Sequence, residues 1–267
     1  MLPDGFRHGG CAGSVSVVEH DQLEVGRVTQ AKLVPACQGL GRLAGFGGAL
    51  AGTRLTSVDP AGELARAIPA KHIVGCVVHA GCSVQEPGLI CHHFGNGLIL
   101  GEPSGEKTGR VYQLAALLQK AGFDATVSEQ IQNDIWFKLW GNLTFNPLSA
   151  LTHATLEDIC RFPPTRALAA AMMTEARTVA EALGVRFKIS LDQRIAGAEA
   201  VGAHKTSMLQ DVEAGRALEL EALVGSVVEL GRITDTPTPT IAAIYAATRL
   251  LGHTLGRQRG RLQVQAA

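Results

Sequence analysis

A single long segment, residues 131–152, limits what this chain can fold into. Its sequence is IQNDIWFKLWGNLTFNPLSALT, in which apolar side chains cover most of the circumference of a helix. A helix of this kind is largely buried in a folded protein. Three polar side chains, Lys138, Asn142 and Asn146, interrupt the apolar pattern at steps of four residues. Because each step of four turns the direction by only about 40°, all three project from one side of the helix.

These three polar residues have two interpretations. A lysine with two asparagines on one side of a helix is commonly just the solvated face of that helix. The aromatic neighbours argue for burial instead, since both tryptophans of the chain, Trp136 and Trp140, lie among them. Buried polar groups need partners, and burial lowers the pKa of a lysine unless a carboxylate compensates. An ammonium group beside two amides can hold a small oxyanion, so this side of the helix is the candidate site.

Two separated motifs carry a family resemblance. Residues 138–151 match the signature K-L-x-x-N-x-x-x-N-P-L-[ST]-A-[LI]. Residues 204–225, HKTSMLQDVEAGRALELEALVG, retain the pattern S-M-x-Q-D followed by an acidic residue. In this order the motifs resemble the 2-dehydropantoate 2-reductases, also called ketopantoate reductases. The resemblance runs from about Gly45 to the C-terminal region.

The resemblance implies a role for each of five residues. Lys138 takes the place of the catalytic acid, Asn142 and Asn146 of substrate-positioning amides. Ser207 takes the place of a carboxylate or hydroxyl contact, and Glu219 of an anchor for substrate and lysine. The implied chemistry is intelligible, because hydride arriving at a ketone carbon leaves negative charge on oxygen, which an ammonium group stabilises and then protonates.

The implied activity is reduction of 2-dehydropantoate to (R)-pantoate by NADPH, on the route to pantothenate and coenzyme A. Two alternatives stay open. A reductase of another small 2-keto acid could keep the same lysine and asparagines, because one helix does not specify the alkyl group of the substrate. A truncated, non-catalytic remnant of the family could keep the substrate-binding half and never receive hydride.

The cofactor-binding half departs from the family pattern. A complete member begins with a strand and a G-x-G-x-x-G turn, whose backbone amides and following helix bind the cofactor pyrophosphate. Nothing in residues 1–32 matches, because the glycines there precede the short strand-like run SVSVVE. The later cluster of Gly39, Gly41 and Gly45 has the wrong spacing. We therefore expect the chain to lack the first part of this domain, and we assign no cofactor-binding residues.

The pattern of elements predicts an α/β part followed by an all-α part. We expect residues 1–128 to form an incomplete Rossmann-like NADP-binding domain, with no fold assigned to residues 1–38. Residues 129–267 would form a helical substrate-binding and catalytic domain, which the resemblance likens to that of 6-phosphogluconate dehydrogenase. Strands are expected near 72–84, 88–93 and 97–101, and helices near 62–67, 107–122, 130–152, 164–183, 189–201, 207–231 and 239–252. The pairs Pro87-Gly88 and Asn96-Gly97 predict turns between antiparallel strands.

Three residues are expected to shape the helices around the site. Twelve residues of straight helix would separate Ser207 from Glu219 by roughly 18 Å, so we expect two helical pieces hinged near Gly215. Ser207 also suits the N-cap of a helix that begins at Met208, and this role is compatible with substrate binding. Pro147 predicts either a kink or the end of its helix.

Composition excludes several classes of function. The formal net charge is zero, which disfavours partners such as nucleic acid and anionic membranes. No apolar segment reaches membrane-spanning length, and the six cysteines form no C-x-x-C pair, so we expect reduced thiols and a cytoplasmic protein. We expect no metal site, because the spacing of the histidines and cysteines between residues 79 and 93 matches no known one. The oligomeric state stays open, with a homodimer as one candidate.

Overall fold

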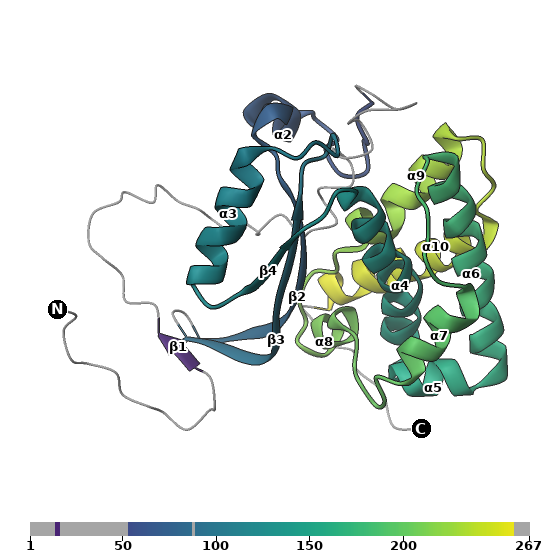
Figure 1. Cartoon of the computed structure of the whole chain (residues 1–267). Coiled ribbons are helices and arrows are strands. Elements are labelled where there is room, and N and C mark those ends of the chain that lie inside the picture. The colour runs from purple at the N-terminus through teal and green to yellow at the C-terminus, as the bar shows by residue number, and fades with distance from the viewer. Residues whose placement is uncertain (1–13, 17–52, 87–88, 259–267) are drawn as a thin grey trace.

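The computed structural model describes residues 14–16, 53–86 and 89–258, and it arranges them in three layers (Figure 1). A small sheet lies in the middle. Helix α3 (Gly109–Lys120) covers one face of the sheet, and α4 (Ile131–Thr152) with the other C-terminal helices covers the opposite face. The predicted glycine clusters and most of the N-terminal segment lie outside the described residues.

The sheet is built around one long strand, β3 (Leu89–Gly101). On one side β3 pairs antiparallel with β2 (Gly75–Glu86), and it also pairs with β1 (Ser14–Ser16) and, in parallel, with β4 (Asp124–Val127). Successive side chains of β3 point to opposite faces. Leu98 and Leu100 pack with α3, whereas Ile99 packs against the helical core, so the strand is covered on both sides.

The predicted turn at Asn96-Gly97 is wrong, because β3 runs through it without a break. The strand accommodates these residues through an irregular register opposite His79 and Gly81. Gly95 has a φ of +68°, and a Cβ there would lie 2.3 Å from the His79 carbonyl oxygen. The glycines therefore mark a bulge where two strands approach closely, and the strand does not turn there. The antiparallel pairing of β2 with β3 is as predicted.

Most of the remaining elements are helices, and after β4 the described chain contains no further strand. The sequence did not predict β4 or the short helix α5. The bounds of the elements not yet given are α2 (Glu63–Ala67), the 3-10 turn η1 (Ala70–His72), α5 (Leu156–Arg161), α6 (Pro163–Ala182), α7 (Leu191–Glu199), α8 (Ser207–Glu213), the π-helical turn η2 (Glu221–Gly225), α9 (Ser226–Ile233) and α10 (Pro239–Arg257).

Helix α4 is the centre of the helical part, as its apolar circumference predicts. Leu139, Trp140 and Leu143 are completely buried, and α4 packs against α6, α8 and α10 as well as against β2. The helix continues through Pro147 to Thr152, so the alternative that it ends at the proline is wrong. Helical packing on several sides holds the segment in place despite the backbone hydrogen bond that proline removes.

Helix α8 is terminated by a glycine that lies two residues beyond its last residue, as the geometry of the second motif predicts. Gly215 has a φ of +65°, its N–H donates to the Val212 carbonyl, and the N–H of Arg216 donates to the Asp211 carbonyl. This pair of hydrogen bonds is a Schellman motif, in which glycine occupies the left-handed position at low cost. The predicted hinge near Gly215 is confirmed, and the chain turns there before η2 and α9.

Candidate active site

The apolar side of α4 fixes the orientation of the helix. The indole N–H of Trp140 donates to the Met173 carbonyl at 2.8 Å, and the Trp140 ring lies 4.4 Å from the ring of Phe187 between centroids. Thr144 donates to the Trp140 carbonyl within the helix. Every polar atom of these buried side chains therefore has a partner, and the helix has one packing orientation.

Lys138, Asn142 and Asn146 lie on one continuous helix, and together we call them the polar side of α4. Lys138 and Asn142 are half-buried and Asn146 is buried, so the interpretation as a fully solvated face is wrong. Burial increases along the helix from the lysine to the second asparagine, which is 5% exposed. The polar side of α4 is therefore partly enclosed by other elements while it keeps access to solvent.

Lys138 points toward the sheet. Its Nζ donates to the backbone carbonyl of Val78 in β2 at 2.5 Å, so the lysine bridges the helical part and the sheet. The next residue, His79, has a lowered pKa because of partial burial and then because of the positive charge of Lys138. Burial raises the pKa of the Cys76 thiol, and Lys138 opposes that shift. The ammonium group thus acts electrostatically on β2 at the junction of the two parts.

Asn146 connects the two sequence motifs. Its Nδ2 donates to the hydroxyl oxygen of Ser207 at 3.4 Å, across the contact between α4 and α8. The prediction that Ser207 is an N-cap is wrong, because Thr206 takes that position and its hydroxyl accepts from the Leu209 N–H. Both residues are competent caps, and the chain uses the first. As a result the Ser207 side chain is not committed to the end of its own helix.

Glu219 lies after the Schellman turn, two residues before η2. The residue is exposed, its carbonyl accepts from the Leu223 N–H, and the η2 turn that follows packs against α4 and α10. The turn at Gly215 removes the geometric obstacle of a straight helix between Ser207 and Glu219. The role of Glu219 stays a prediction from the family resemblance, as do the individual roles of the other four residues.

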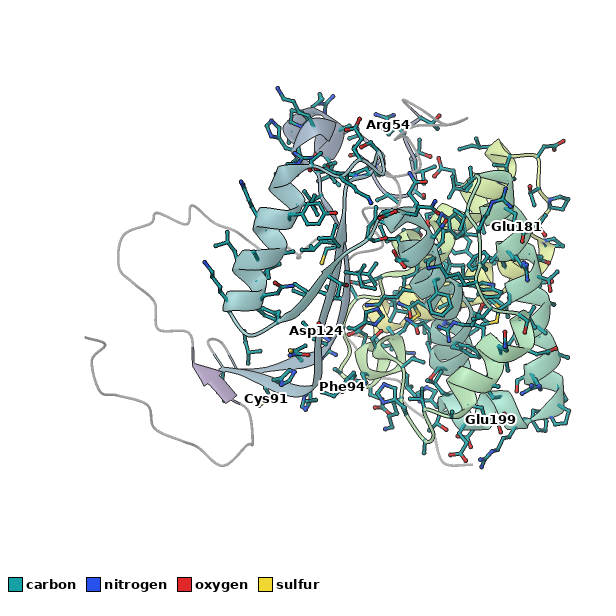
Figure 2. All side chains as sticks on the ribbon, viewed as in Figure 1. Arg54, Cys91, Phe94, Asp124, Glu181 and Glu199 are labelled. Atoms are coloured by element: carbon teal, nitrogen blue, oxygen red, sulfur yellow. The ribbon has the colours of Figure 1, made fainter. Side chains whose placement is uncertain are left out.

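A second contact joins the sheet to the helical part. Phe94 lies at the end of the sheet nearest α8 (Figure 2), and its ring meets that of His204 edge to face, with centroids 6.2 Å apart. Neither this contact nor the Val78 carbonyl as a partner of Lys138 was predicted from the sequence. No local pattern indicates either contact, because both join residues far apart in the chain.

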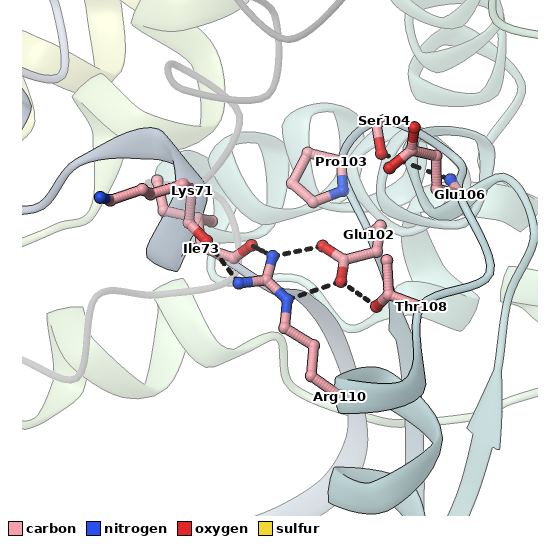
Figure 3. Close-up of a pocket in the computed structure, with 8 residues that line it drawn as sticks. All are labelled: Lys71, Ile73, Glu102, Pro103, Ser104, Glu106, Thr108 and Arg110. Carbon is pink, nitrogen blue, oxygen red and sulfur yellow. Dashed lines mark hydrogen bonds and ion pairs between the residues drawn. The ribbon is translucent and has the colours of Figure 1, made fainter.

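A separate open cavity of about 460 Å³ lies where β3 leads into α3 (Figure 3). In its wall Glu102, which is 4% exposed, accepts from Arg110 Nε at 2.6 Å and from Nη2 at 2.5 Å. Arg110 also donates to the carbonyls of Lys71 and Ile73, and Thr108 donates to the same carboxylate. The guanidinium holds the pKa of Glu102 below its usual value. We call this group the Glu102–Arg110 clamp, since it ties β3, α3 and η1 together.

Residues 14–16, 53–86 and 89–258 contain no cluster of three or more side chains that could hold a metal ion. Within the same residues no helix is both long enough and apolar enough to cross a bilayer.

Comparison with known proteins adds a family to this geometry. The family model described as "Ketopantoate reductase PanE/ApbA C terminal" matches residues 130–252, which include all five predicted site residues. The chain is 54% identical over 207 residues to a 2-dehydropantoate 2-reductase of Mesorhizobium japonicum. It is 31% identical over 237 residues to a 2-dehydropantoate 2-reductase of Halobacterium salinarum.

A solved structure agrees with these relatives. The chain superposes on the crystal structure of a protein from Ralstonia solanacearum, assigned to the ketopantoate reductases, with a TM-score of 0.77 and 45% identity over 80% of this chain. The matched part amounts to 65% of the Ralstonia protein, 64% of the Mesorhizobium protein and 77% of the Halobacterium protein. The chain therefore spans less than two thirds of the length of two of these three proteins.

Proposed function

This chain belongs to the ketopantoate reductase family, and we propose that it acts in the NADPH-dependent reduction of 2-dehydropantoate to (R)-pantoate. The observation that carries the proposal is the contact between Asn146 and Ser207, which joins the two motifs at one place on α4. Lys138 lies on the same side of this helix, two turns away, at the junction with the sheet. The two relatives in Mesorhizobium and Halobacterium bear the name of this activity.

Lys138 would act as the acid that protonates the new hydroxyl group. As a hydride reaches the ketone carbon, the electron pair of the carbonyl bond moves to oxygen, and the ammonium group stabilises this charge. Transfer of one proton from Nζ to the oxygen then completes the alcohol and leaves a neutral amine. A lysine suits this role because it can release its proton, whereas an arginine holds its proton too firmly.

Asn146 and Ser207 would hold the rest of the keto acid. The Ser207 oxygen accepts from the Asn146 amide, so the hydroxyl hydrogen of Ser207 can be donated to a carboxylate or hydroxyl of the substrate. Asn142 lies between Lys138 and Asn146 on the same side and is half-buried, which suits an amide that positions the keto group. Glu219 would anchor the lysine and the substrate from the chain before η2.

The cofactor would supply the hydride, but the described residues do not fit its pyrophosphate. A dinucleotide site needs a glycine turn between a strand and a helix N-terminus. The two such connections among the described residues are 102–108 and 128–130, and both carry acidic side chains and lack the G-x-G-x-x-G spacing. NADPH remains the hydride donor of the proposal, and no described residue is assigned to bind it.

Two further predictions accompany the activity. We assign the protein to the cytoplasm, supported by the four described cysteines, which are all free thiols as in a reducing compartment. A homodimer stays a prediction. Light scattering on the protein as it elutes from a size-exclusion column would give its mass and decide between a monomer and a dimer.

The test is a titration of the purified chain with NADPH, followed by fluorescence, and then addition of 2-dehydropantoate. The proposal predicts saturable binding and oxidation of the cofactor, with the pyrophosphate held by residues other than the two connections 102–108 and 128–130. Lys138→Ala should lower kcat about 10³-fold, because a general acid contributes on that order. Lys120→Ala, at an exposed lysine of α3, is the matched control and should leave kcat unchanged. An unchanged kcat of the Lys138→Ala variant, or a folded protein that binds no NADPH, would overturn the proposal.

A further inference from the structure

Between α8 and α9 the chain forms one turn of π-helix, η2 (Glu221–Gly225). A π-turn is rare in proteins, and such turns occur frequently at functional sites. The extra residue of the turn changes the direction of the side chains before it relative to those of α9 after it. Glu219 is two residues before η2, and its backbone carbonyl accepts a hydrogen bond from the N–H of Leu223 within the turn, so the π-turn holds the backbone of Glu219.

One side chain of the π-turn is held by α10. Glu221 accepts a hydrogen bond from the hydroxyl of Tyr245 at 2.5 Å, and its other oxygen lies 3.5 Å from Nε of Arg249. The Arg249 guanidinium lies 5.9 Å from the centre of the Tyr245 ring. Tyr245 and Arg249 are one turn apart on α10, so a single helix face holds this carboxylate.

The last residue of η2, Gly225, lies close to this contact and leaves little space there for a side chain. A Cβ at Gly225 would lie 2.7 Å from Oε2 of Glu221 and 3.3 Å from the Tyr245 hydroxyl. A larger residue would require the carboxylate end of Glu221 to shift. The backbone of η2 at Gly225 therefore lies close to the hydrogen bond between Glu221 and Tyr245.

The surroundings keep the Tyr245 hydroxyl a donor. Burial, and then the hydrogen bond to Glu221, raise the pKa of Tyr245 to about 12. An open cavity of about 610 Å³ adjoins the pair and is also lined by Glu229, Arg232 and Arg249. Glu229 is already occupied, since it accepts hydrogen bonds from residues 56 and 57. The hydrogen bond from the Tyr245 hydroxyl to Glu221 thus connects α10 to the π-turn.

We propose that Tyr245 is a positioning residue for the reaction, whose hydroxyl holds Glu221 and thereby fixes the π-turn so that Glu219 is directed toward the polar side of α4. This inference rests on the proposed function, because Glu219 is given its role there. Tyr245 touches neither substrate nor reacting atoms, and it acts only through η2. The contacts of η2 with both α4 and α10 provide the physical connection.

The test is a double-mutant cycle of Tyr245→Phe with Glu219→Ala, read by calorimetric binding of (R)-pantoate, which needs no cofactor. Tyr245→Phe alone should weaken binding about fivefold, which corresponds to about 1 kcal/mol, the net contribution of one typical hydrogen bond. In the Glu219→Ala protein the same change should have no further effect, because residues that act as one unit are not additive. The control is Tyr112→Phe, at the only other tyrosine, which is exposed on α3 and should bind as wild type does.

The possible outcomes distinguish a failure of the proposed role of Tyr245 from a failure of the proposed function. A fivefold loss that persists in the Glu219→Ala background would mean that Tyr245 acts on stability or elsewhere, and would overturn the inference alone. No effect of Glu219→Ala on binding, or no binding by the wild type, would overturn the proposed role of Glu219 and the inference with it. Thermal unfolding of each variant shows whether the protein is folded under the assay conditions.

Discussion

The Glu102–Arg110 clamp and the polar side of α4 are two polar clusters in one chain that use their hydrogen bonds differently. In the clamp a buried carboxylate faces a guanidinium at 2.5 and 2.6 Å, and two further guanidinium N–H groups donate to backbone carbonyls. On α4 the contact between Asn146 and Ser207 is neutral, 3.4 Å long, and ends at an exposed side chain. The polar groups of the clamp bond to one another and to the backbone, so they stabilise the fold. The polar side of α4 still has donors and acceptors that a ligand can use.

The largest expected effect in this comparison is the loss of stability when the clamp is broken. Glu102→Ala should lower the free energy of unfolding by about 2 kcal/mol, because it removes a buried acceptor of charge-assisted hydrogen bonds. Binding of (R)-pantoate should stay within a factor of two of wild type. Urea unfolding with calorimetry on the same samples measures both quantities. A loss of binding without a loss of stability would show that the clamp, and not α4, is the ligand site.

A smaller effect is expected at α8, where a substitution should weaken ligand binding and leave stability nearly unchanged. Ser207→Ala should weaken (R)-pantoate binding about tenfold and change the free energy of unfolding by less than about 0.5 kcal/mol, since its neutral contact is long. Its neighbour is the matched control, because Thr206→Ala removes the N-cap and should cost about 1 kcal/mol of stability. If Ser207→Ala proves the more destabilising of the two variants, then its hydroxyl serves the fold and the comparison fails.

The smallest effect concerns the pH dependence of the clamp. The folded-state pKa of Glu102 is lowered below the ordinary value of 4.5, so the stabilisation is fully present above that value and is lost as pH falls through the folded pKa. The difference in unfolding free energy between wild type and Glu102→Gln should therefore be constant from about pH 8 to 5.5 and shrink below about 4.5. Urea titrations at several pH values give this difference. A difference that grows on acidification would contradict the assigned ion pair.

The sequence predicted the elements with strong local signals. The α/β-then-all-α order is confirmed, α4 was placed from its apolar periodicity, and the hinge at Gly215 followed from the distance that a straight helix would impose. The polar side of α4 followed from the same periodicity. The division into domains at residue 128 and the roles of the five site residues stay predictions.

The sequence failed where a distant part of the chain decides the outcome. The four residues of β4 form a strand because β3 offers a parallel partner, and nothing in the segment itself indicates this. Asn96-Gly97 has a turn signal, but the long pairing with β2 holds β3 extended. Thr206 and Ser207 are both competent N-caps, and only the structure shows which is used. In the clamp Arg110 donates to the carbonyls of Lys71 and Ile73, which lie 39 and 37 residues earlier in the chain, so no spacing rule could find it.

The most direct test of the account is a nuclear magnetic resonance titration of the ¹⁵N-labelled chain with (R)-pantoate. The account predicts saturable shifts of the side-chain amide signals of Asn142 and Asn146 and of the backbone amide of Ser207, while the Arg110 Nε signal of the clamp stays in place. Shifts that gather at residues 102–110 and leave α4 unchanged would contradict the assignment of the polar side of α4 as the substrate site.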